Sequence, residues 1–63
     1  MKGMATCRKA AGLTQAAFAE AIGVDRSAVA KWEAGAAYPS ADKLPVIAKT
    51  LGCSIDALYG APA

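Results

Sequence analysis

Apolar residues recur at helical spacing along the chain, in short segments that end at glycine. The clearest segment precedes Gly52, and its apolar side chains follow the i, i+3, i+4, i+7 spacing of one helix face at Leu44, Ile47, Ala48 and Leu51. Val29 and Trp32 lie three positions apart and turn one face of an earlier helix inward. We expect five helices and no strand, so the pattern predicts an all-α fold with one core.

Capping residues and glycines mark the ends of these helices. Thr14, Asp25 and Ser54 are good N-caps, because a short side chain with an oxygen atom can accept a hydrogen bond from the first turn. Proline suits the first turn of a helix, so Pro45 places the regular start of the fourth helix at Leu44 rather than after Ser40. The predicted helices run from Lys2 or Met4 to Ala11, from 15 to Ile22, from 26 through Trp32 or Glu33 to Gly35, from 44 to 51, and from Ile55 to Tyr59.

Length and composition favour a single domain over residues 1–63. Cys7 and Cys53 are too few for a disulfide framework, and we interpret each as a small buried apolar residue rather than half of a redox pair. No apolar run is as long as a membrane span and no charged leader precedes the first helix, so a soluble, cytoplasmic protein is expected. Alanine dominates the apolar content, so the core must be built from a few large side chains: Leu13, Phe18, Ile22, Val29, Trp32, Leu44, Ile47, Leu51, Ile55 and Leu58.

Residues 14–35 combine two short helices with a tight turn. Ala19 is small enough to let the second of these helices approach closely, and Gly23 can adopt the positive φ with which a chain leaves a helix within one residue. Two helices joined in this way form a helix-turn-helix. Such a unit can place its second helix in the major groove of DNA.

These residues, with others along nearly the whole chain, resemble the Cro/repressor-type helix-turn-helix family, also called the xenobiotic-response-element family. The resemblance implies a compact five-helix domain of the lambda-repressor-like type, whose third helix reads bases and whose second helix lies across the DNA backbone. The residues that match in order and spacing are Arg8, GLTQ at 12–15, Ala19, Gly23, Val24, Val29, WEAG at 32–35, Pro39, Leu44, Ile47, Ala48, Leu51, Gly52, Ser54, Ile55 and Asp56.

On the third predicted helix, Ser27 and Lys31 fall on the side opposite the buried residues, and Arg26 occupies the exposed N-terminal flank. Arg26 and Lys31 can donate to guanine O6 and N7, and the Ser27 hydroxyl can pair with several base edges. Ala30 lies beside them and offers a methyl group that can pack on thymine. On composition alone, this face would be interpreted as an ordinary solvated helix surface. The surrounding motif favours the functional interpretation.

Contacts to the DNA backbone are expected from the second helix and from the region after the third. The first N–H groups of a helix are unpaired and its dipole makes that end mildly positive, so a phosphate oxygen fits there beside the Gln15 amide. The resemblance implies the same clamping role for Gln15, whereas Thr14 serves mainly as the cap. The loop at 36–42 is less basic than is common in the family. The full set of candidates is Thr14, Gln15, Tyr38 and Lys43.

Glu33 lies close to the inward side of the third helix, where a carboxylate needs a cation. Arg8 on the first helix is the candidate partner, and the family resemblance implies the same pair. We expect the Arg8–Glu33 ion pair to hold the first helix against the recognition helix. This structural role removes one of seven basic residues from DNA binding.

The net charge of +2 is modest for a DNA-binding protein, so few counterions would be released on binding. We therefore expect the chain to bind double-stranded DNA as a homodimer on a two-fold operator. The expected function is regulation of transcription, more specifically repression. The dimer contact is expected at Tyr59, beside Ala57 and Ala61, with nearby residues of the fourth or fifth helix.

Two other function classes were weighed against DNA binding. A protein-interaction module on the same fold, such as an antitoxin that binds a partner protein, is the alternative, and the weakly basic loop supports it. Catalysis is not expected, because the sequence has no histidine, no clustered carboxylates and no glycine-rich phosphate loop. We also expect no metal, no cofactor and no small-molecule ligand.

Overall fold

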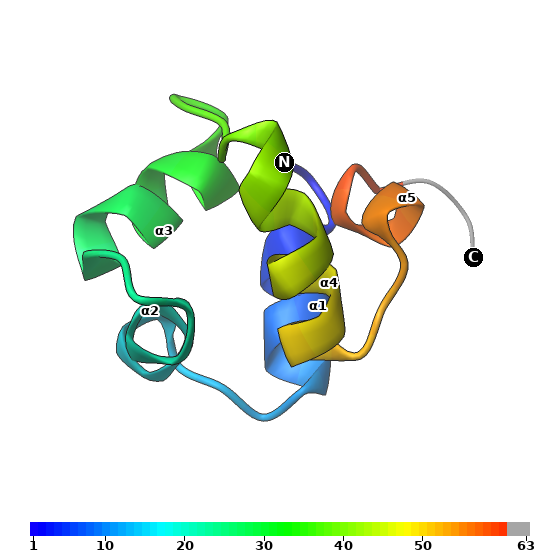
Figure 1. Ribbon diagram of the computed structural model, residues 1–63, viewed down its shortest axis with the longest axis horizontal. Helices are drawn as coiled ribbons and strands as arrows, with labels where there is room; N and C mark the ends of the chain where they lie inside the picture. The colour runs from blue at the N-terminus through cyan, green and yellow to red at the C-terminus, as the bar shows by residue number, and fades with distance from the viewer. Residues whose placement is uncertain (61–63) are drawn as a thin grey trace.

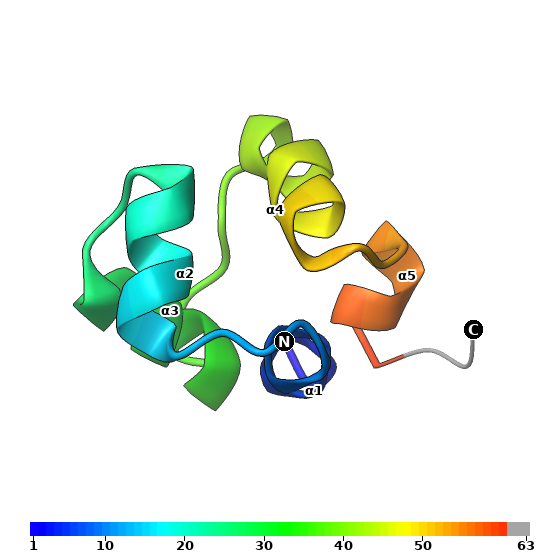
Figure 2. The same cartoon turned by 90° about the horizontal axis from the view of Figure 1, so that it is seen from below.

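Five α-helices and one short 3₁₀ turn make up residues 1–60, the part of the chain that the computed structural model describes. Figure 1 shows α2 and α3 on one side of the molecule, α5 on the other, and α1 and α4 between them. Seen from below in Figure 2, α1 and α4 lie on opposite sides of the core. This arrangement confirms the predicted all-α, five-helix fold. The elements are α1 (Met4–Ala10), α2 (Gln15–Ile22), α3 (Arg26–Ala34), η1 (Ala41–Lys43), α4 (Leu44–Leu51) and α5 (Ile55–Leu58).

Side-chain caps start two of these helices as the sequence predicts. The Ala17 N–H donates to the Thr14 hydroxyl oxygen at 3.0 Å, and the Ala57 N–H donates to the Ser54 hydroxyl oxygen at 3.1 Å. Asp25 takes the N-cap position of α3 with extended backbone, but its side chain makes no capping hydrogen bond. The sequence therefore predicts the N-cap residue of all three helices correctly. The predicted side-chain hydrogen bond forms at Thr14 and Ser54 but not at Asp25.

The start of α4 follows the prediction made from Pro45. Residues Ala41–Lys43 form a 3₁₀ turn, and the regular helix begins at Leu44, one residue before the proline. At the other end of the chain, α5 stops at Leu58 rather than Tyr59, which is its C-cap. The difference of one residue is within the usual fraying of a short helix.

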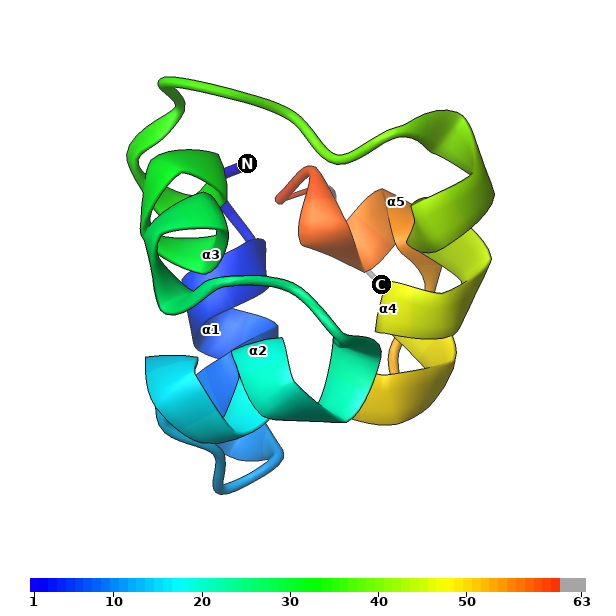
Figure 3. The same cartoon turned by 60° about the vertical axis from the view of Figure 1, so that its left-hand side comes forward.

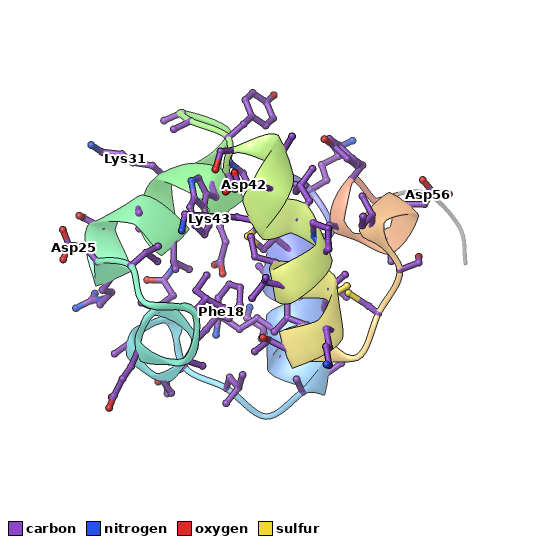
Figure 4. All side chains as sticks on the ribbon, in the orientation of Figure 1. Phe18, Asp25, Lys31, Asp42, Lys43 and Asp56 are labelled. Atoms are coloured by element: carbon purple, nitrogen blue, oxygen red, sulfur yellow. The ribbon has the colours of Figure 1, made fainter. Side chains whose placement is uncertain are left out.

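Ile55 is the member of the predicted core that the structure contradicts, since 37% of its surface is exposed. In α5 Leu58 is the buried residue, whereas Ile55, on the same side of the helix, begins α5 at the surface. Phe18, labelled in Figure 4, points from α2 toward α1 and α4 at the centre of the core. The buried apolar residues are Met1, Met4, Phe18, Ala19, Val29, Trp32, Ile47, Ala48, Leu51 and Leu58.

The margin of the core is made of half-buried side chains. Leu13, Ile22 and Leu44, predicted as core, pack against it from positions that solvent still reaches. Cys7 and Cys53 are half-buried in the same way, so the prediction that each is a buried apolar residue is only partly right. Met1 and Met4, which were not predicted as core, are buried in the centre instead.

Gly3 sets how closely α1 approaches α5. A methyl group at this position would lie 1.7 Å from the Ala57 carbonyl oxygen, so a larger residue would push the two segments apart. The Gly3 N–H donates to the Leu58 carbonyl at 3.0 Å across the same contact. A backbone hydrogen bond therefore ties the start of α1 to the end of α5.

The helices of residues 1–60 are short. The longest, α3, has nine residues, and none in this range is long and apolar enough to cross a bilayer.

Candidate nucleic-acid interface

A tight turn joins α2 to α3 and fixes the angle between them. Gly23 ends α2 with φ of 76°, in the left-handed region that suits glycine. Its N–H donates to the Glu20 carbonyl at 3.3 Å, and the Val24 N–H donates to the Ala19 carbonyl at 2.9 Å. Ala19 is buried where α3 packs closely on α2, which is the role predicted for a small residue here.

The two faces of α3 differ sharply in exposure. Val29 and Trp32 are buried in the core. Arg26, Ser27 and Lys31 are exposed. Figure 4 shows Lys31 pointing from α3 away from the rest of the molecule. The helix thus presents a basic and hydroxyl-bearing face to solvent while its apolar face anchors it.

Ala30 is half-buried, at the border between those two faces of α3. Its small side chain adds no bulk beside the exposed Lys31 and Ser27. The long side chains of Arg26 and Lys31 are thus separated on α3 by the smaller Ser27 and Ala30. A helix of this shape can enter a groove of DNA without a steric obstacle at its centre.

At the start of α2, the two candidate backbone-contacting residues have different surroundings. Thr14 is exposed, and its hydroxyl oxygen accepts the capping bond of the helix. Gln15 is half-buried, and its Nε2 donates to Glu33 Oε1 at 3.0 Å. The hydrogen bond from Gln15 to Glu33 was not predicted from the sequence. Gln15 lies on α2 and Glu33 lies on α3. Which residues of these two helices face each other depends on how the helices pack, and no local sequence pattern specifies that.

The predicted Arg8–Glu33 ion pair is present and joins α1 to α3. Arg8 Nε donates to Glu33 Oε2 at 2.7 Å, and Nη2 donates to Oε1 at 3.3 Å, in the two-pronged geometry that arginine favours. The side chains are 10% and 9% exposed. Arg8 Nη1 also donates to the Leu13 carbonyl at 2.7 Å. One guanidinium therefore ties together α1, the α1–α2 connection and α3.

Burial and the interactions between the two charged groups shift the pKa values of Arg8 and Glu33 in opposite directions. Burial would raise the pKa of the Glu33 carboxyl, but hydrogen bonds from Arg8 and Gln15, with the charges of Arg8 and Lys9, hold it below its ordinary value. The hydrogen bond to Glu33 raises the pKa of Arg8 against the opposing effect of burial. Both groups are charged at neutral pH, and the Gln15 amide is held by that fixed negative charge.

Acidification is expected to weaken the fold through Glu33. Because its folded pKa lies below the ordinary value of 4.5, the stabilisation is complete above that value and is lost as the pH falls through the folded pKa. The thermal midpoint of the parent should fall between about pH 5 and pH 3 by more than that of Glu33→Gln. Glu20→Gln, on the exposed surface of α2, is the matched control. Equal losses in the parent and in Glu33→Gln would contradict the assignment.

The segment between α3 and the start of α4 carries the last two candidate contacts. Figure 3 shows it passing across the molecule from the end of α3 to α4. Tyr38 is 67% exposed, and Lys43 is half-buried at the end of η1. Asp42 precedes Lys43, and the Ser40 side chain lowers the pKa of its exposed carboxyl. A negative charge thus stands beside the lysine and reduces the positive potential of this segment.

The structure gathers the candidate residues on the side of the molecule formed by α2, α3 and the start of α4. Arg8 and Glu33 lie behind this surface and support it. Within residues 1–60 no group of three or more histidine, cysteine, aspartate or glutamate side chains could hold a metal ion.

Residues 4–58 match the protein family described as Helix-turn-helix. Over 51 residues, 81% of this chain, the sequence is 41% identical to the HTH-type transcriptional activator BcrR of Enterococcus faecalis. Over 57 residues, 90% of this chain, it is 40% identical to the cryptic phage CTXphi transcriptional repressor RstR of Vibrio cholerae serotype O1. No solved structure matches the chain significantly.

These matches cover 25% of BcrR and 51% of RstR, so the chain spans between a quarter and about half the length of the relatives it matches. The matched region contains the whole helix-turn-helix and every predicted contact residue. The predicted resemblance is confirmed over nearly all of the described chain. With its α2–turn–α3 unit, its five helices and this match, the chain belongs to the helix-turn-helix family.

Proposed function

We propose that this chain is a DNA-binding regulator of transcription that places α3 in the major groove of duplex DNA. The observation that carries the proposal is the exposed surface of α3, where Ser27 and Lys31 stand opposite the buried Val29 and Trp32 and Arg26 is exposed in the first turn. Family membership and two relatives named as regulators of transcription agree with it. The cytoplasmic location expected from the sequence stays part of this proposal.

Base readout is assigned to four positions of α3. Arg26 and Lys31 supply donors for guanine O6 and N7, Ser27 supplies a hydroxyl, and the Ala30 methyl is placed to pack on thymine. Arg26 and Lys31 lie five positions apart on α3, so they would contact different base pairs. The preference for a base at each position should therefore depend on a different side chain.

Contacts to the DNA backbone are assigned to the start of α2 and to the segment before α4. The Gln15 side-chain amide donates one N–H to Glu33. Its second N–H can then donate to a phosphate oxygen. Thr14 exposes the first turn of α2 to the same phosphate, and Tyr38 and Lys43 would contact the neighbouring backbone. Held by Glu33, the amide is oriented before DNA arrives.

Repression is the regulatory direction that we propose. RstR, which is named a transcriptional repressor, aligns with 90% of this chain, whereas BcrR, named an activator, aligns with 81% and with only a quarter of its own length. A domain bound at a promoter blocks access to it without further parts. Activation would need a surface beyond the contacts described above.

Selection of bound duplexes from a random DNA pool tests the proposal. Enrichment of one sequence family is expected, with half-sites about one helical turn apart if two copies bind together. Binding should weaken as salt rises, because lysine and arginine contacts release counterions. No enrichment over the input pool, in low salt and at high protein concentration, would refute sequence-specific DNA binding.

A homodimer on a two-fold operator is the assembly that we propose for this function. Tyr59 is 53% exposed at the end of α5, beside half-buried Ala57 and exposed Ile55. Ala61, the other residue predicted in this patch, lies outside the described residues. Such a patch can pair with its own copy around a two-fold axis.

Sedimentation of the chain, free and on a palindromic duplex, tests this dimer. Two chains per duplex are expected, with weaker pairing for Tyr59→Ser than for the parent. For the free chain, where the DNA contact assigned to Tyr38 plays no part, Tyr38→Ser is the matched control, since it removes an exposed tyrosine outside the proposed dimer patch. One chain per palindromic duplex at every concentration would exclude the dimer.

Binding of a partner protein is the second candidate function. The placement of Asp42 beside Lys43 favours it, since this segment then attracts phosphate less strongly. Recovery of a stable complex with one partner protein, together with failure of the duplex selection, would establish that function in place of DNA binding.

A further inference from the structure

A hollow and an exposed aromatic side chain lie next to each other where the start of α1 meets α5. The hollow is open to solvent and has a volume of about 480 Å³. Tyr59 is exposed and directly precedes Gly60, which forms part of the wall. This surface therefore has a recess and a projection side by side. The residues that line the hollow are Lys2, Gly3, Thr6, Cys7, Ala57 and Gly60.

Close packing holds the two sides of this hollow together. A methyl group at Gly3 would lie 1.7 Å from the Ala57 carbonyl oxygen, and one at Gly60 would lie 3.0 Å from Lys2 Cβ. The segment that begins α1 and the end of α5 therefore pack directly on each other. The recess keeps a fixed position beside Tyr59 as a result.

Charges of both signs lie on the same surface. Lys2, in the wall of the hollow, and Asp56, on α5, are both exposed. The Tyr59 N–H donates to the Asp56 carbonyl at 3.1 Å, so these two residues lie one turn apart on α5. Figure 4 shows Asp56 on the outer side of that helix. Within residues 1–60 neither Lys2 nor Asp56 takes part in an ion pair, so both charges can meet a second chain.

We propose that a second copy of the chain occupies this hollow. Tyr59 of each copy inserts into the hollow of the other, and Asp56 of each copy pairs with Lys2 of the other. A two-fold interface uses the same surface on both copies, so that surface must be complementary to itself. This one meets the requirement, because it carries a recess beside a projection and a cation beside an anion. The inference rests on the proposed homodimer and specifies its contacts.

The chemistry of the hollow suits a tyrosine side chain. Burial of an aromatic ring is favourable, while the hydroxyl at its tip can stay in contact with water. The alkyl stem of Lys2 can pack on the ring, and its ammonium group can reach a carboxylate at the edge of the hollow. Charges at the edge of an interface determine mainly which surfaces pair. The charge pattern is therefore the feature that variants can reverse.

Reversing the two charges on separate chains tests the pairing. Lys2→Glu alone and Asp56→Lys alone each place like charges opposite each other twice in a homodimer, so each variant should self-associate about tenfold more weakly than the parent. In an equal mixture the two variants should associate about as well as the parent, because every contact of the mixed dimer then joins opposite charges. Sedimentation of the free chains in low salt, where charges are least screened, measures both effects.

Lys49→Glu and Glu20→Lys are the matched controls, because they make the same changes of charge at exposed positions outside the hollow. Alone and mixed, they should associate like the parent. Thermal unfolding should show that all four variants are folded.

The ring of Tyr59 is tested by a separate comparison. Tyr59→Phe keeps the ring and should associate like the parent, whereas Tyr59→Ser should not. Equal losses in the two variants would show that the hydroxyl makes the contact, which contradicts insertion of the ring.

Three results would overturn the inference. If Lys2→Glu and Asp56→Lys each associate like the parent, or if their mixture associates as weakly as each alone, the assigned contacts are wrong although the homodimer itself stands. A parent that stays monomeric at every concentration, free and on a palindromic duplex, would exclude both the homodimer and these contacts. None of these results bears on DNA binding, which the duplex selection tests.

Discussion

Replacing Arg26 or Lys31 with alanine is expected to relax the base preference at particular positions of the bound site while the fold stays intact. Each side chain stands on the exposed face of α3 and supplies donors for base edges. A good contact of this kind discriminates against the wrong base by about 1–3 kcal/mol. Selecting duplexes with each variant, beside the parent, should show loss of preference at different positions for the two residues.

A backbone contact should behave differently when it is removed. Lys43→Ala is expected to weaken binding about equally across sequences and to make the salt dependence shallower, because one released counterion is lost with the lysine. Gln15→Ala should also weaken binding uniformly. Its amide bonds Glu33 in the structure, so its melting temperature must be measured beside its affinity. Lys43 is therefore the cleaner of the two test positions.

The matched control is Lys49→Ala, which removes the same charge from the exposed end of α4. It should change neither the base preference nor the affinity beyond the small effect of net charge. The contrast among these variants distinguishes contacts to the bases from contacts to the DNA backbone. If Arg26, Lys31, Gln15 and Lys43 can all be replaced while every duplex is bound as by the parent, α3 does not read DNA and binding of a protein partner becomes the leading function.

Features fixed by neighbours in the sequence were predicted well. Thr14 and Ser54 cap their helices with the expected hydrogen bonds, and Pro45 marks the start of α4. Each rests on a physical rule that acts within one or two helical turns. The same holds for the two faces of α3, since the spacing of Val29 and Trp32 determines which side is buried.

Features fixed by the approach of distant segments were mostly missed. The hydrogen bond from Gln15 to Glu33 depends on how helices cross, which no local pattern specifies. Gly3 was not singled out, because its demand for space comes from the Ala57 carbonyl on α5. The Arg8–Glu33 pair is the exception. An inward-facing carboxylate needs a cation, and family resemblance implied the same partner.

Removing the carboxylate of Glu33 is expected to have the largest effect on stability. In Glu33→Ala the Arg8 guanidinium stays largely buried but loses its carboxylate partner. It keeps its hydrogen bond to the Leu13 carbonyl. Breaking a buried pair in this way costs roughly 3 kcal/mol in the free energy of unfolding. A domain of this size should then melt more than about 10 °C below the parent. Thermal unfolding followed by circular dichroism measures the loss.

Replacing both partners distinguishes the cost of an unpaired charge from the value of the pair itself. Arg8→Met combined with Glu33→Leu removes both charges and fills the space with apolar side chains, so it should recover much of the loss seen in Glu33→Ala. Glu20→Ala, on the exposed surface of α2, is the matched control and should leave the melting temperature nearly unchanged. If Glu33→Ala melts like the parent, water reaches the pair and it acts as a surface contact. If the double variant melts as low as Glu33→Ala, the ion pair is itself needed to hold α1 against α3, and the unpaired charge is not the cause of the loss.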